Sequence, residues 1–117
     1  MLFQALLDRL VGSVEGAQGA VMMDASGEVV FEAGDGDERH RLIGAYQGIA
    51  LMRLKNAEER CDIGEVHHVY CRYSDGHVIL RPLKDGYYLV ISLAPAANLG
   101  QALFRSAETR ERLDAEL

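Results

Sequence analysis

Apolar residues recur at two different periods along the chain, and the changes between these periods predict the order of helices and strands. From Leu2 to Val14 the apolar positions are three and four residues apart, which is typical of an amphipathic helix. Ala20 to Met23 and Glu28 to Glu32 favour strands, and the turn formers at Asp24 to Gly27 separate them. The N-terminal part is therefore predicted to be a helix followed by a β-hairpin.

The remainder of the chain predicts a long helix, three strands and a final helix. The long helix is expected from about Glu38 to Ala57, with Asp35 or Asp37 as its N-terminal cap. Short turns at 74–76 and 84–86 join the strands into an antiparallel meander. The strands are expected at Glu65–Tyr73, His77–Leu83 and Tyr87–Leu93. After Asn98 the chain is expected to be helical to Leu117.

The helix expected over 38–57 carries apolar or small residues on two opposite sides. The stripe predicted to face the sheet consists of Leu42, Ile43, Tyr46, Ile49 and Ala50. The opposite side carries Gly44, Gly48, Leu51 and Met52. Because a glycine inside a helix costs about 1 kcal/mol relative to alanine, Gly44 and Gly48 favour the close approach of a helix from another protein. The alternative is that both glycines are weak spots in a loosely packed helix.

Composition is that of a folded protein of one domain, expected over residues 1–117. Apolar residues make up 49% and charged residues 26% of the chain. The net charge of −6, with basic residues dispersed among acids, disfavours nucleic acid and anionic membranes as partners. No apolar run approaches the roughly 20 residues that cross a bilayer. Cys61 and Cys71 are too few for a disulfide framework, so a cytoplasmic location is expected.

Catalytic, metal and cofactor sites are not expected from the residue spacing. His67 and His68 are adjacent on a predicted strand and point to opposite faces, so they do not bind one metal ion together. Gly16 and Gly19 precede a strand and are not followed by Lys-Ser or Lys-Thr, which excludes a phosphate-binding loop. The chain is therefore not expected to bind GTP itself.

Two stretches of sequence carry a family likeness. Val14–Val30 combines a strand rich in glycine and small apolar residues with the turn Asp24-Ala25-Ser26-Gly27. The second stretch runs from Leu80 through Ile91 to Asn98-Leu99-Gly100. Together with the order of elements, these stretches resemble the roadblock/LC7 family of small-GTPase-associated proteins. The resemblance implies an α+β fold in α/β/α layers, of order α-β-β-α-β-β-β-α. In this profilin-like fold the middle helix covers one face of a five-stranded antiparallel sheet, and the terminal helices cover the other.

The resemblance also implies homodimers or heterodimers, in which the middle helices pack together and the third strands join edge to edge. A third strand over 65–73, without proline and with few charges, would be prone to aggregation as a free edge. An edge shielded by a helix or loop is the alternative. The expected dimer interface comprises Gly44, Gly48, Leu51, Met52, Val66, His68 and Tyr70.

Functionally, the resemblance implies a homodimeric regulator or scaffold that is not itself an enzyme and binds a Ras-like small GTPase. Some prokaryotic members of the family assist GTP hydrolysis by their partner, and eukaryotic members serve in dynein or lysosomal scaffolds. If this chain stimulates hydrolysis, Arg39, Arg41 or Arg53 is the candidate for stabilising transition-state charge. The alternative is a small-molecule sensor or signal-transduction adaptor with a pocket between sheet and helix. An enzyme ranks last, because no set of acid, base and nucleophile emerges.

Overall fold

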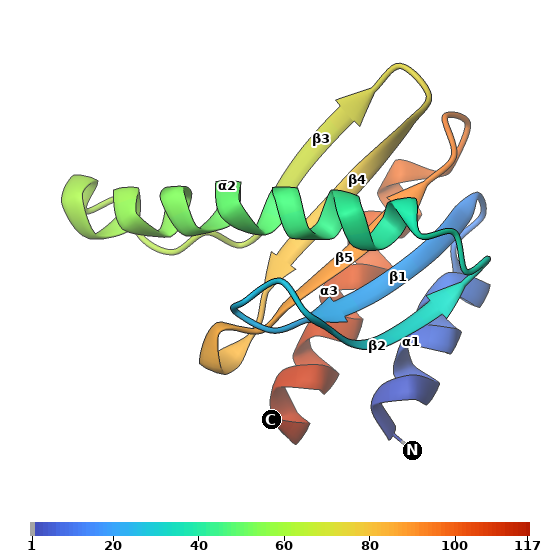
Figure 1. Cartoon of the computed structure of the whole chain (residues 1–117), viewed down its shortest axis with the longest axis horizontal. Helices are drawn as coiled ribbons and strands as arrows, with labels where there is room; N and C mark the ends of the chain where they lie inside the picture. The colour runs from blue at the N-terminus through green and yellow to red at the C-terminus, as the bar shows by residue number, and fades with distance from the viewer. Residues whose placement is uncertain (1) are drawn as a thin grey trace.

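Five antiparallel strands form one sheet, and helices cover both of its faces (Figure 1). The structure is a computed structural model that describes residues 2–117. In chain order the elements are α1 (Leu2–Ser13), β1 (Ala17–Met23), β2 (Val29–Gly34), α2 (Arg39–Cys61), β3 (Val69–Tyr73), β4 (Gly76–Pro82), the 3-10 turn η1 (Lys84–Gly86), β5 (Tyr88–Leu93) and α3 (Leu99–Glu116). The predicted α+β fold class and element order are confirmed. The single domain over 1–117 stays a prediction, and Met1 lies outside the described residues.

The strands are arranged in the order β2-β1-β5-β4-β3. The hairpin of β1 and β2 and the meander of β3, β4 and β5 are both as predicted. Pairing of β1 with β5 joins these two units, which leaves β2 and β3 as the sheet edges. None of the described helices is long and apolar enough to cross a membrane.

Alternation along the strands divides the core into two layers. On β1, Met22 packs in the layer with α1 and α3, whereas Val21 and Met23 pack in the layer with α2. On β5, Leu89 and Ile91 follow the first pattern and Tyr88 and Val90 the second. Successive side chains of a strand point to opposite faces, and both faces are covered, so β1 is apolar at each position from Ala20 to Met23 and β5 from Leu89 to Ile91.

The orientation of α2 reverses the one predicted from the helical wheel. Gly44, Gly48 and Leu51 are buried against the sheet, so the prediction that they form an outward dimer face is wrong. A Cβ atom on Gly44 would lie 2.5 Å from the Met23 sulfur, and one on Gly48 would overlap the Tyr88 hydroxyl. The glycines do serve close packing, as predicted, but the partner is the sheet of the same chain.

Two element boundaries differ from their predicted positions by four residues, and β1 begins at Ala17, three residues before the predicted Ala20. Helix α2 continues four residues past Ala57 to Cys61 and ends where Asp62 adopts a left-handed conformation. The third strand begins at Val69 instead of Glu65. The reason lies in the connection between them, because the Val66 backbone N–H donates to the Glu58 carboxylate of α2 and not to a neighbouring strand. At the other end of α2 the N-cap position is Glu38, which makes no side-chain capping bond, and not the predicted Asp35 or Asp37. Asp37, one residue earlier, accepts the Arg39 backbone N–H at 3.0 Å.

Replacing Gly48 tests the packing of α2 on the sheet. We expect Gly48→Ala to lower the free energy of unfolding by about 1–3 kcal/mol, because the added methyl group overpacks the contact with Tyr88. Gly12→Ala in α1 is the matched control, since its Cβ would meet no atom within 4 Å and alanine favours helix by at most about 1 kcal/mol. Urea unfolding measures both. Unchanged or increased stability of Gly48→Ala would contradict the close approach.

Candidate protein-interaction surface

An apolar stripe lies along the side of α2 that faces away from the sheet. This outer stripe consists of Leu42 (52% exposed), Tyr46 (74%), Ile49 (57%) and Met52 (52%). The first three were predicted to face the sheet, and that prediction is wrong. Of the four helix residues expected at a dimer interface, Met52 alone is exposed. Large apolar side chains grouped on one helix face are typical of a surface that another protein covers.

The free edge of β3 is held to the same side of the molecule by Gln47. This α2 side chain donates to the Tyr73 hydroxyl at 2.6 Å and accepts the Cys71 thiol at 3.6 Å. Within residues 2–117, β3 pairs only with β4, so its other edge is open. Helix α2 and the edge strand are therefore fixed relative to each other, and a partner that adds to the strand would meet both elements.

The three remaining residues of the expected interface lie near this edge but not in one strand. Val66 is half-buried and His68 is exposed, and both precede β3 in the irregular connection from α2. Partial burial lowers the pKa of His68, and the nearby charges of Arg81 and His67 lower it further. Tyr70 lies in β3, where its hydroxyl is 2.9 Å from Nδ1 of His77. Tyr70 therefore lies in β3 and the other two residues lie outside it, and a role of Tyr70 at an interface stays a prediction.

The three candidate arginines are not brought together. Arg39 and Arg41 lie in the first turn of α2, and Arg53 follows about 18 Å further along the axis at about 1.5 Å per residue. Arg39 binds the Asp37 carboxylate at 2.6 Å, and Arg41 makes two bonds of 2.7 and 2.6 Å to Glu32. Arg53 is exposed one turn after Ile49, and no ion pair holds it within residues 2–117.

The carboxylates of these pairs titrate below their ordinary range. The hydrogen bond from Arg39 lowers the pKa of Asp37 from 3.8 to about 2. In the same way the hydrogen bond from Arg41 lowers the pKa of Glu32. Both carboxylates are therefore charged at neutral pH and hold their arginines near the start of α2. Arg53 is paired with no carboxylate in the described part of the chain, so it is the candidate arginine most available to a partner.

Beneath the start of α2, a cavity of about 180 Å³ lies between the helix and the sheet. Among the residues that line this cavity, two buried polar atoms have no hydrogen-bond partner within residues 2–117, namely Nδ1 of His40 and Oγ of Ser92. The other ring nitrogen, Nε2 of His40, is 2.7 Å from the Asp35 carboxylate. No group of three or more metal-ligating side chains suited to a metal ion occurs in the described part of the chain.

Sequence reasoning missed both the outer stripe and this cavity. The glycines signalled a close contact of α2, but their spacing carries no information on whether the neighbour is the sheet or a second molecule. The polar lining of the cavity includes His40 of α2, His77 of β4 and Ser92 of β5, which share no local motif. Their proximity arises from the pairing of strands and could not be read from spacing.

Comparison with known proteins agrees with this architecture. The family model described as Roadblock/LC7 domain matches residues 3–93. MglB of Myxococcus xanthus superposes with a TM-score of 0.86 at 14% identity, covering 98% of this chain and 94% of that chain. A Roadblock/LC7 domain from Streptomyces avermitilis gives a TM-score of 0.85 at 18% identity, with 97% and 95% covered.

MglC of Myxococcus xanthus is similar over the full length of both chains, with 25% identity and a TM-score of 0.70. Profilin II of Acanthamoeba castellanii gives a TM-score of 0.69 at 16% identity, covering 97% of this chain and 98% of that chain. These low identities show the profilin-like fold and no more. No curated protein sequence matches the chain.

Proposed function

The chain belongs to the Roadblock/LC7 domain family, and from this membership we propose that it acts as a homodimeric regulator or scaffold of a Ras-like small GTPase. The observation that carries the proposal is the outer stripe of α2, together with the open edge of β3. A second copy of the chain covers both elements through helix–helix and strand–strand contact. In this arrangement Arg53, beside the stripe, is the residue available to a bound GTPase.

Three features support self-association through this surface. The chain has a net charge of −6, but the outer stripe itself carries no charged side chain. Contact between two stripes therefore does not bring like charges together. Gln47 fixes the stripe relative to β3, which limits the conformational entropy lost on association. In a two-fold dimer the same patch is used by both copies, so a single contact covers the outer stripes of both chains.

A charge in the centre of the outer stripe tests the dimer. We expect Ile49→Asp to weaken association at least tenfold, about 1.4 kcal/mol, because it places a carboxylate in an apolar contact. Ala5→Asp, at an exposed position of α1 on the other side of the sheet, adds the same charge and is the control. Sedimentation velocity over a concentration series measures both variants. Equal dimer affinity of Ile49→Asp and wild type would remove α2 from the interface.

Capture from a lysate of the source organism tests the GTPase partner. The immobilised domain is incubated with lysate that contains GDP or a non-hydrolysable GTP analogue, and bound proteins are identified by mass spectrometry. We expect enrichment of a small GTPase in one nucleotide state. With the purified GTPase, Arg53→Ala then separates a regulator of hydrolysis from a scaffold, because only in the former does the hydrolysis rate fall. Recovery of no GTPase in either state would contradict the proposal.

The cavity beneath α2 favours a second candidate function, a small-molecule sensor. Its two unpartnered atoms, on His40 and Ser92, are groups that a bound polar ligand would satisfy. Such a ligand is expected to raise the melting temperature of the wild type, and Ser92→Ala to lose this shift. Ser74→Ala, in the exposed turn after β3, is the control. A metabolite panel without any compound that shifts the wild type would count against this candidate.

A further inference from the structure

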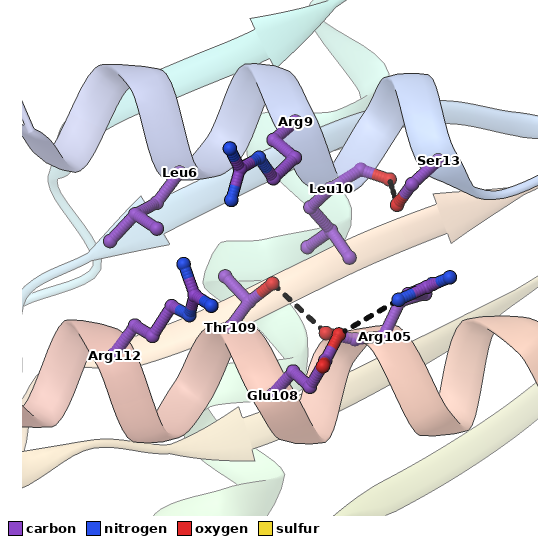
Figure 2. Close-up of a pocket in the computed structure, with 8 residues that line it drawn as sticks. All are labelled: Leu6, Arg9, Leu10, Ser13, Arg105, Glu108, Thr109 and Arg112. Carbon is purple, nitrogen blue, oxygen red and sulfur yellow. Dashed lines mark hydrogen bonds and ion pairs between the residues drawn. The ribbon is translucent and has the colours of Figure 1, made fainter.

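A pocket of about 320 Å³ lies between α1 and α3, on the opposite side of the sheet from α2 (Figure 2). Leu6 and Leu10 of α1 line it with apolar groups. Arg9 enters from α1, and Arg105 and Arg112 enter from α3. Figure 2 shows the guanidinium groups of Arg9 and Arg112 directed into the gap between the two helices. Small-molecule sites have volumes of roughly 300–1,000 Å³, so the pocket fits a small ligand.

The charges in this pocket are not balanced. Glu108 is the one carboxylate among the lining residues, and it pairs with Arg105 at 3.1 Å. Neither Arg9 nor Arg112 forms an ion pair within residues 2–117. Two unmatched positive charges therefore face each other across the pocket, on a chain whose net charge is −6. Their repulsion is relieved when an anion lies between them.

Helix α1 offers Arg9 no acidic side chain one turn away. The residues one turn before and after it on α1 are Ala5 and Ser13, which carry no charge. In addition, Nε of Arg105 is buried and has no hydrogen-bond acceptor in the described part of the chain. A buried N–H group without a partner is unfavourable, and an anion oxygen in the pocket would supply the missing acceptor.

We propose that the pocket between α1 and α3 binds a free phosphate-class anion, for which pyrophosphate is the test ligand. The planar guanidinium group donates two parallel hydrogen bonds to phosphate oxygens, which a chloride ion does not match. A phosphate group carries a charge of roughly −1.5 to −2 near pH 7, which balances the two unmatched arginines better than a single carboxylate does. The site is independent of the GTPase partner, because it lies on the other side of the sheet from α2.

Titration of the purified protein with pyrophosphate, at constant ionic strength, tests the site by calorimetry. We expect saturable binding with one site per chain, weakened at least tenfold in Arg9→Gln and in Arg112→Gln. Both residues are exposed, so these variants keep the fold. Arg60→Gln removes the same charge from an exposed position of α2 and is expected to bind within twofold of wild type. Arg9→Lys, which keeps the charge without the planar fork, is expected to fall between wild type and Arg9→Gln.

Amide chemical shifts provide the second measurement. Pyrophosphate is expected to perturb residues of α1 and α3 around the pocket, Ser13 and Thr109 among them. Three results would overturn the proposal: no saturable binding by wild type, an equal loss of affinity in Arg60→Gln, or perturbations centred outside α1 and α3. Each of these results leaves the GTPase proposal untouched, since no GTPase is present in the experiment.

Discussion

The contact between Tyr88 and the two glycines of α2 is the constraint on which the rest of this molecule depends. The Tyr88 hydroxyl occupies the notch at Gly48 and donates to the Gly44 carbonyl at 3.2 Å. Burial raises the pKa of Tyr88, so the hydroxyl keeps the proton that it donates. A side chain at Gly48 would clash with the Tyr88 ring of β5, and one at Gly44 would displace the Met23 side chain of β1. This contact fixes both the distance of α2 from the sheet and its rotation about its own axis.

The rotation of α2 decides what the protein presents on that side. With the glycine stripe against the sheet, Leu42, Tyr46 and Ile49 are more than half exposed, and one helix alone covers this face. On the other face, α1 and α3 pack against each other and the sheet. There Arg81 of β4 reaches α3, where it donates to Ser106 and to the Leu103 carbonyl at 2.9 Å each. Two helices therefore cover one face of the sheet, whereas the single helix on the other face leaves large apolar side chains exposed.

The pairing of charged side chains also differs between the two faces of the sheet. On the α2 side, Arg39 and Arg41 are neutralised by Asp37 and Glu32, which leaves an apolar stripe suited to protein contact. On the side of α1 and α3, the core is closed but arginines gather without sufficient acids. We therefore propose a protein partner for the first face and a small anion for the second.

The sequence by itself determined the types of the elements, their order, and the three strand pairings between chain neighbours. These features depend on local periodicity and on turn residues, and the structure confirms them. Ion pairs within one helix, such as Arg105 with Glu108, are equally local, because residues three or four apart share a helix face. The hydrogen bond from the Arg39 backbone N–H to Asp37 belongs to the same group. Each of these interactions is completed within a few residues of the chain.

Tertiary structure alone decided the rotation of α2, the start of β3 and the composition of both pockets. Both stripes of α2 consist of apolar or small residues, so periodicity locates them but does not show which one faces the sheet. The glycine stripe faces the sheet because only glycine leaves room for the Tyr88 side chain. The residues before Val69 favour a strand, but the Val66 N–H donates to the Glu58 carboxylate and not to a neighbouring strand. Arg9 and Arg112 line one pocket only because α1 and α3 pack on the same face of the sheet. Contacts between distant segments depend on this global packing, which a local pattern of residues does not encode.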